Sequence, residues 1–210
     1  MPTEFIHKFT PGRVPFTLLL LHGTGGDEND LLPVGRALAP GAAFLSPRGK
    51  VLENGMPRFF ARTAPGLWDP KEVVARAAEL ADWIGSACAQ YGIDSTRLYA
   101  LGYSNGANIA AALLLLHPGV IAGAALLRPA LPLRPETLPV LNGAPVLISA
   151  GAVDDMVPPE GAEALGRLLS EAGAHVDIAM QNAGHELTPA DFNLGKQWFA
   201  RLTAASASAV

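Results

Sequence analysis

Short, almost uninterrupted apolar runs alternate along the chain with longer segments in which apolar residues recur every three or four positions. The short runs are typical of strands buried on both faces, and the longer segments of amphipathic helices. Strands are predicted at 16–23, 42–46, 121–127, 145–150 and 175–181, with another beginning at 97. Helices are predicted at about 27–39, 69–91, 108–117, 159–171 and 190–202. This alternation predicts an α/β fold with a mainly parallel sheet and helices on both faces.

Polar and glycine residues mark the ends of these elements. Asp69 followed by Pro70 is a strong helix start, and Gly92 is a natural residue to end the same helix. Asp27 and Asn29 offer N-caps for the earlier helix. Residues 47–69 show no clear period, so they are expected to form an unusually long loop, and loops of that length tend to be functional.

Composition favours a packed globular protein. The chain has 210 residues, of which 50% are hydrophobic and 16% charged. We expect one domain over 1–202 and a flexible tail over 203–210. The net charge of −4 and the scattered Lys and Arg argue against a nucleic-acid partner.

The sequence also allows predictions about membrane insertion and cellular location. No apolar run approaches the roughly 20 residues that cross a bilayer, so no stable membrane insertion is expected. The first residues lack the apolar core of a secretory signal. Cys88 is the single cysteine, which excludes an internal disulfide and fits a cytoplasmic location.

The stretch LGYSNG at 101–106 contains the pattern G-x-S-x-G where a strand ends and a helix begins. That setting is typical of a nucleophile elbow, in which a sharp turn presents a serine hydroxyl to solvent. Ser104 is therefore the candidate nucleophile. The alternative is a glycine-rich turn with no chemical role.

A nucleophilic serine needs a base, and the base needs an orienting acid. His185 follows the strand 175–181 and is the candidate base. Two adjacent carboxylates, Asp154 and Asp155, follow the strand 145–150, and their spacing does not choose between them.

The segment LHGTGGDEND at 21–30 follows a predicted strand and is rich in glycine. Glycines allow a backbone to approach a substrate closely, and acyl transfer requires two N–H donors for the oxyanion. The candidate donors are the backbone amides of Thr24 and Asn105, while His22 is expected to be structural. A plain glycine-rich turn before a capped helix is the alternative.

Five ordered segments together resemble one branch of the α/β-hydrolases. The segments are LHGTGGDEND, SPRGKVLENGMPRFF, LGYSNGANIA, GAVDDMVP and AGHEL. They are similar to the phospholipase/carboxylesterase family, close to acyl-protein thioesterases and to bacterial hydrolases linked to hydroquinone resistance. The acid segment of that family maps onto Asp154, although Asp155 stands where the family usually has proline. The resemblance also implies a homodimer.

The predicted reaction is hydrolysis of a small-molecule ester through an acyl-enzyme, with no metal or organic cofactor. The candidate pocket residues are Met56, Phe59, Phe60, Trp68 and Met156. The alternative is that the aromatic residues are buried in the core beneath the loop. A chain this short leaves little room for a cap domain, which favours a carboxylesterase for short to medium acyl chains. The alternatives are a lysophospholipase or acyl-protein thioesterase for long chains, and a catalytically silent hydrolase fold that binds a small ligand.

Overall fold

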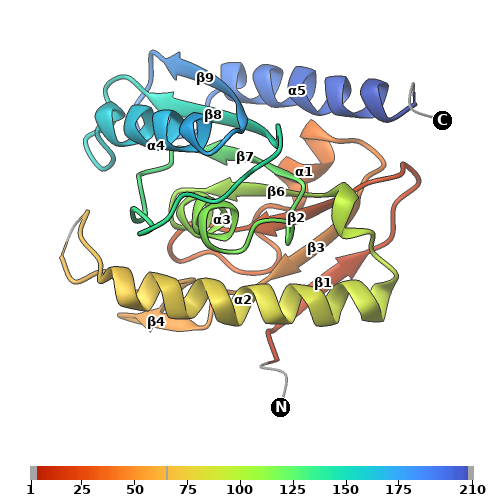
Figure 1. The fold of residues 1–210 in the computed structure, drawn as a ribbon, viewed down its shortest axis with the longest axis horizontal. Helices are drawn as coiled ribbons and strands as arrows, with labels where there is room; N and C mark the ends of the chain where they lie inside the picture. Colours follow the sequence, from red (N-terminus) through yellow and green to blue (C-terminus); the bar gives the residue numbers. More distant parts are fainter. Residues whose placement is uncertain (1–3, 65, 208–210) are drawn as a thin grey trace.

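The computed structural model describes residues 4–64 and 66–207 and contains a seven-stranded sheet between two layers of helices (Figure 1). The strands of this sheet are β1 (His7–Thr10), β2 (Thr17–Leu21), β3 (Ala43–Pro47), β6 (Leu98–Tyr103), β7 (Gly123–Leu127), β8 (Pro145–Gly151) and β9 (His175–Gln181). The helices are α1 (Leu32–Leu38), α2 (Pro70–Tyr91), α3 (Asn105–Leu116), α4 (Pro159–Glu171) and α5 (Pro189–Ala207). A 3₁₀ turn, η1 (Ser95–Arg97), precedes β6.

The strands lie in the order β1-β3-β2-β6-β7-β8-β9. All neighbouring pairs are parallel except β1 with β3, which is antiparallel. Parallel strands end at the same edge of a sheet, so the segments that follow β2, β6 and β8 are brought together there. The mainly parallel sheet expected from the sequence is confirmed.

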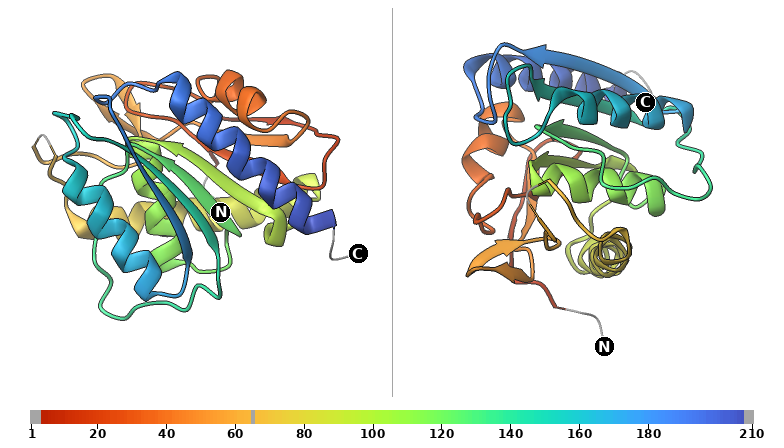
Figure 2. Two further views of the ribbon diagram at one scale, coloured as in Figure 1. Left: turned by 90° about the horizontal axis from the view of Figure 1, so that it is seen from above. Right: turned by 90° about the vertical axis from the view of Figure 1, so that its left-hand side faces the viewer.

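Each buried strand supplies side chains to two separate cores. On β2, Leu19 and Leu21 pack into the core beneath α2, α3 and α4, while Leu18 and Leu20 pack into the core beneath α1 and α5. Figure 2 shows the two helix layers on opposite sides of the sheet. Both faces of the strand are therefore covered, which explains why its sequence is continuously apolar rather than alternating.

Several elements differ from the expected ones. Helix α1 begins at Leu32 rather than near residue 27, because the Asp27 carboxylate accepts a hydrogen bond from the Asn29 amide and closes a turn first. The edge strand β1 was not expected at all. Helix α5 continues to Ala207, so residues 203–207 are helical in backbone rather than a tail, and 208–210 lie outside the described residues.

The expected loop at 47–69 contains a hairpin of β4 (Val51–Glu53) and β5 (Met56–Arg58). Its two turn residues, Asn54 and Gly55, have φ values of 52° and 80°. Two residues at positive φ are the requirement of a tight turn between antiparallel strands, and Asn-Gly is the pair that best accepts it. The strands are only three residues long, so no alternating pattern marked them in the sequence.

The first turn of α3 lies directly against the end of β2. A Cβ atom on Gly106 would overlap the carbonyl oxygen of Leu21, and one on Gly102 would lie 2.6 Å from the carbonyl oxygen of Gly106. By contrast, a Cβ atom on Gly85 in α2 would meet nothing within 4 Å.

These contacts predict opposite effects of the same substitution. Gly106→Ala should lower the free energy of unfolding by about 3 kcal/mol or more, because backbone atoms must separate. Gly85→Ala should raise it by about 0.5–1 kcal/mol, because alanine has the better helix propensity. Chemical denaturation of the two variants measures both changes. Equal changes in the free energy of unfolding would show that the close contact at Gly106 does not affect stability.

Candidate active site

Ser104 occupies the turn between β6 and α3. Its φ and ψ values are 53° and −116°, a conformation that non-glycine residues rarely adopt. The backbone amide of Ser104 donates to the carbonyl of Leu127 at 2.9 Å, which fixes the turn to the end of β7. The strained residue therefore presents its side chain at the edge of the sheet where the parallel strands end.

A chain of two hydrogen bonds joins the three residues that the sequence suggested. His185 Nε2 lies 2.9 Å from Ser104 Oγ, and His185 Nδ1 lies 2.8 Å from Asp154 Oδ2. The three residues come from the segments after β6, β8 and β9. The structure thus brings together groups that lie 31 and 81 positions apart in the chain.

Asp154 is the carboxylate that contacts the histidine. It is 5% exposed, and its second oxygen accepts hydrogen bonds from the amides of Met156 and Val157, both at 2.9 Å. These two bonds fix the carboxylate plane and leave Oδ2 directed at His185. Asp155 is exposed at the surface of the same loop.

A buried arginine holds the segment that carries His185. Arg128 Nε donates to the carbonyl of Gly184 at 2.9 Å, and Nη2 donates to that of Glu186 at 2.7 Å. Arg128 also forms two hydrogen bonds to Asp191, of 2.8 and 2.9 Å, and both side chains of this pair are at most 1% exposed. The backbone carbonyls on either side of His185 therefore accept hydrogen bonds from one buried guanidinium group.

Asp191 is stabilised as a carboxylate by its surroundings. Burial would by itself raise the pKa of Asp191, but hydrogen bonds from Arg128, Ser149 and Thr188 outweigh it and lower the pKa from 3.8 to about 2. Sequence reasoning missed both Arg128 and Asp191. The signal that could have found Arg128 is a charged residue directly after a fully buried strand.

The backbone amides of Thr24 and Asn105, two residues that line the cavity beside Ser104, have no hydrogen-bond partner among the described residues. The loop that carries Thr24 is held by a bond of 2.9 Å from the Gly25 amide to the carbonyl of Pro57. The side chain of Asn105 is buried and its Oδ1 accepts from the Phe59 amide at 2.7 Å. Both donors therefore lie on backbone that is fixed by other bonds.

His22 lies beneath this loop. Its Nδ1 donates to the carbonyl of Gly23 at 2.7 Å, and its Nε2 accepts from the amide of Gly49 at 2.9 Å. Burial lowers the pKa of His22, although the hydrogen bond to Gly23 opposes that effect. Both nitrogens of this neutral imidazole are hydrogen-bonded to the backbone, so His22 joins two loops and has a structural role.

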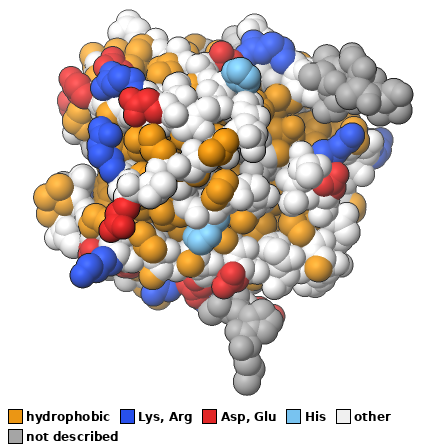
Figure 3. All heavy atoms as spheres, viewed as in Figure 1, with side chains coloured by type: hydrophobic (Ala, Val, Ile, Leu, Met, Phe, Trp, Pro, Cys, Tyr) orange, Lys and Arg blue, Asp and Glu red, His pale blue; other side chains and the backbone are white. Residues whose placement is uncertain are grey.

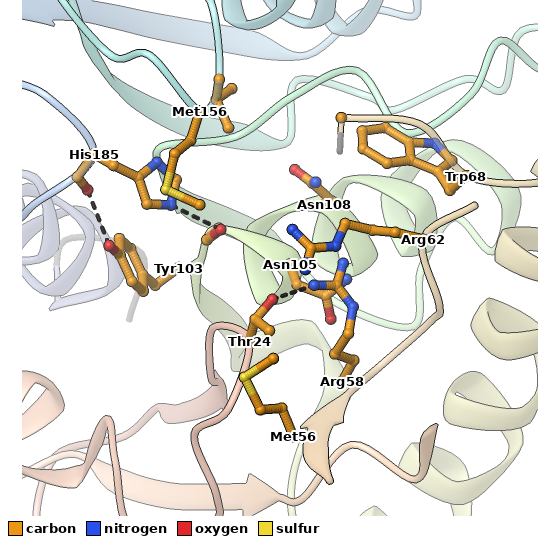
Figure 4. A pocket seen from close by; sticks show the side chains of 13 residues that line it. Thr24, Met56, Arg58, Arg62, Trp68, Tyr103, Asn105, Asn108, Met156 and His185 are labelled. Carbon is orange, nitrogen blue, oxygen red and sulfur yellow. Dashed lines mark hydrogen bonds between the residues drawn. The ribbon is translucent and has the colours of Figure 1, made fainter. Parts of the chain in front are cut away.

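A cavity of about 340 Å³ opens above Ser104 (Figure 4). Three of the expected pocket residues, Met56, Trp68 and Met156, line it. The Trp68 indole donates to the carbonyl of Pro132 at 2.5 Å, which fixes the ring in the wall. The remaining wall includes polar residues: Arg58, Arg62, Tyr103 and Asn108.

The expected contribution of Phe59 and Phe60 to the pocket is wrong. Both rings are buried in the core, at 3% and 0% exposure, and neither lines the cavity. Phe59 packs on the ring of His22 with centroids 4.8 Å apart, and Phe60 packs on Trp68 with centroids 5.6 Å apart. The two residues follow β5 and lie in the core behind the wall of the cavity.

Comparison with known proteins agrees with this arrangement. No family model matches the chain. The Bacillus subtilis (strain 168) protein "Putative hydrolase MhqD" is 45% identical over 193 residues, which cover 92% of this chain and 96% of that protein. The chain belongs to the carboxylesterase-like α/β-hydrolases. This α/β-hydrolase is thus a hydrolytic enzyme, as the sequence indicated.

Solved structures support the same family. The Bacillus cereus carboxylesterase is 42% identical with a TM-score of 0.90 and covers 92% of each chain. The Mesorhizobium loti carboxylesterase is 37% identical with a TM-score of 0.84 and covers 90% of each chain. The α/β-hydrolase fold without a large cap domain is therefore confirmed.

The surface of this α/β-hydrolase carries few concentrated charges on the face that Figure 3 displays, where Lys and Arg are scattered among acidic and apolar side chains. Within residues 4–64 and 66–207, no helix is both long and apolar enough to cross a membrane. The same residues contain no group of three His, Cys, Asp or Glu side chains that could hold a metal ion.

The buried pair predicts a large cost for removing one partner. Asp191→Asn should lower the free energy of unfolding at neutral pH by about 3–5 kcal/mol, because Arg128 keeps its charge in the interior. Asp177→Asn is the matched control, since Asp177 pairs with Arg201 at 2.8 Å on an exposed surface. Its cost should stay below about 1 kcal/mol. Denaturant titration compares the two variants.

The same pair predicts a dependence on pH. The pKa of Asp191 is about 2 in the folded protein against 3.8 for the unperturbed group, so its contribution is complete above about pH 4. It should be lost as the pH falls from about 4 to 2, by about 2 kcal/mol in total. The difference in unfolding free energy between the unaltered protein and Asp191→Asn should shrink over that interval; a constant difference would contradict the assignment.

Proposed function

We propose that this hydrolase is a serine esterase in which Ser104 is the nucleophile, His185 the general base and Asp154 the acid that orients the histidine. The observation that carries the proposal is the continuous pair of hydrogen bonds, of 2.8 and 2.9 Å, from carboxylate to imidazole to hydroxyl. A serine hydroxyl is a weak nucleophile at neutral pH, and this arrangement supplies the base that it needs.

The reaction begins with neutral His185, whose Nδ1–H donates to Asp154 and whose Nε2 faces the Ser104 hydroxyl. As Oγ bonds to the ester carbonyl carbon, its proton moves to Nε2 and the carbonyl electron pair moves onto oxygen. Collapse of this intermediate breaks the bond to the alcohol, which leaves with the proton from Nε2. A water molecule then repeats the sequence on the acyl-enzyme and releases the acid.

The tetrahedral oxyanion would be bound by the backbone amides of Thr24 and Asn105. Donors that are free and already fixed stabilise developing charge without reorganisation, and each such donor contributes roughly 3 kcal/mol to the transition state. The lack of partners for both amides among the described residues supports this role. No metal or organic cofactor takes part in the proposed steps.

The proposed substrate is a carboxylic ester with a short to medium acyl chain. The cavity of about 340 Å³ lies near the lower end of the range for small-molecule sites, roughly 300–1,000 Å³. Met56, Trp68 and Met156 give it apolar walls. The names of the carboxylesterase relatives agree with this substrate class. Hydrolysis of long-chain lysophospholipids or acyl-protein thioesters is the second candidate. Met156 is mostly exposed, so the cavity is open to solvent beside it and a longer acyl chain has a way out.

We also propose a single catalytic domain, a cytoplasmic location and a homodimer. The location rests on the lone Cys88, and the dimer rests on the family resemblance. Gel filtration with light scattering measures the assembly directly.

Single substitutions separate the three proposed roles. Ser104→Ala should lower kcat by at least about 10⁴-fold while the protein remains folded. Asp154→Asn should cost about 10³–10⁴-fold, because the imidazole loses its orienting acceptor. Asp155→Asn is the matched control and should behave like the unaltered protein. Hydrolysis of p-nitrophenyl acetate measures all three.

Labelling with a fluorophosphonate probe distinguishes an enzyme from a silent binding protein. The unaltered protein should be labelled and Ser104→Ala should not. Normal turnover by Ser104→Ala, or a larger loss in Asp155→Asn than in Asp154→Asn, would refute the proposed site.

A series of p-nitrophenyl esters from acetate to palmitate tests the acyl-chain length. The value of kcat/KM should be highest for short to medium chains and should fall for palmitate, because the cavity limits the acyl group. A steady rise toward palmitate would favour the lysophospholipase or thioesterase alternative.

A further inference from the structure

Two arginines enter the catalytic cavity from the segment that ends and follows β5. Arg58 is the last residue of β5 and is 4% exposed, and Arg62 lies four residues further along. Figure 4 shows both guanidinium groups beyond Asn105 as seen from His185. The end of the cavity opposite the imidazole is therefore cationic.

Each arginine keeps one nitrogen that forms no hydrogen bond with residues 4–64 or 66–207. Arg58 Nε donates to the carbonyl of Phe60 at 2.9 Å, and Nη1 donates to the hydroxyl of Thr24. Arg62 Nε and Nη2 donate to Glu53 Oε1 at 2.9 and 2.6 Å. Arg58 Nη2 and Arg62 Nη1 form no hydrogen bond with any residue in the described part of the chain.

The negative charges near these arginines lie outside the cavity. Arg58 Nε is 3.2 Å from Glu53 Oε2, so both arginines share one carboxylate. Burial lowers the pKa of Arg58; Glu53 and Glu72 oppose that effect, and Arg62 adds to it. Neither glutamate lines the cavity, whereas both arginines do. A molecule in the cavity therefore meets the cations before the carboxylates.

Asn108 adds a third donor to the same cavity. Its Oδ1 accepts from the Ala130 amide at 2.8 Å, which fixes the orientation of the side-chain amide. Its Nδ2 forms no hydrogen bond with a described residue, and Asn108 lines the cavity. Three donor groups thus belong to a cavity whose described lining residues include no Asp or Glu.

Anchoring of the loop explains only part of this arrangement. The bonds to Glu53 and Phe60 hold the segment 53–62 together, and one buried arginine would suffice for the carbonyl of Phe60. The open nitrogens of Arg58 and Arg62 contribute nothing to that anchoring. Each open nitrogen can donate a charge-assisted hydrogen bond to one oxygen of a carboxylate.

We propose that this end of the cavity is a carboxylate-binding subsite, so that the preferred substrates are esters that also carry a carboxylate group. The inference rests on the proposed esterase function and specifies its substrate class. Arg58 and Arg62 bind the anionic group, and Asn108 donates a further hydrogen bond. The ester carbonyl then lies at Ser104, at the other end of the same molecule.

Paired substrates that differ only in charge test the subsite. Monoethyl glutarate carries the carboxylate in the acyl part, and its neutral counterpart is ethyl glutaramate. Acetoxyacetate carries it in the alcohol part, and its counterpart is acetoxyacetamide. In at least one pair, the anionic ester should have a kcat/KM about 10-fold to 100-fold higher, as expected for charged hydrogen bonds in a partly buried site.

In Arg62→Gln, the ratio of kcat/KM for the anionic ester to that for its neutral counterpart should fall close to one. A general loosening of the loop would lower kcat/KM for both esters and leave their ratio unchanged. Arg167→Gln is the matched control, because Arg167 is exposed, pairs with Glu163 on α4 and lies outside the cavity. It should keep both the ratio and the activity. An unchanged ratio in Arg62→Gln would overturn the subsite.

Competition on the unaltered protein covers the case in which Arg62→Gln does not fold. Glutarate should inhibit hydrolysis of ethyl glutaramate competitively, glutaramide should not, and added salt should weaken the inhibition. Equal inhibition by the two compounds would refute the subsite. Hydrolysis of neutral esters with no preference for either anionic ester would overturn the subsite and leave the esterase intact, whereas no hydrolysis of any ester would overturn both.

Discussion

The direct contact between the first turn of α3 and the end of β2 is the constraint on which the site depends. Gly102 and Gly106 leave no side chain between these backbones, so the turn at Ser104 closes onto Leu21. This approach brings the amide of Asn105 near the loop that carries Thr24. A wider spacing would separate the two amides and remove the serine from the edge where β6, β7 and β8 end.

The opposite side of the site depends on Arg128. This side chain crosses from the end of β7 to the carbonyls on both sides of His185, and Asp191 neutralises it within α5. Buried ion pairs seldom add much net stability, but they fix geometry because each charge must keep its partners. The imidazole is consequently held by the protein interior as well as by Asp154.

The sequence was most informative where chemistry and secondary structure coincide. LGYSNG lies between a strand and a helix, and His185 follows it in the order of this fold, so the candidate nucleophile and base could be named in advance. The candidate acid was limited to two neighbours, Asp154 and Asp155, of which the family resemblance favoured Asp154. The Asn54–Gly55 hairpin was missed because its strands are too short to alternate. Phe59 and Phe60 were placed in the pocket because an aromatic pair in a loop gives no indication of which side faces the core.

By itself, the sequence determined the α/β class, the order of the long helices and the buried strands, and the candidate nucleophile and base, because these depend on local periodicity and on short motifs. Only the tertiary structure decided that Asp154 rather than Asp155 contacts His185, that Arg128 holds the histidine segment, and that Arg58 and Arg62 face the cavity. Those facts depend on the direction in which a side chain leaves its loop. That direction is fixed by contacts with residues far away in the chain, and no local pattern encodes it.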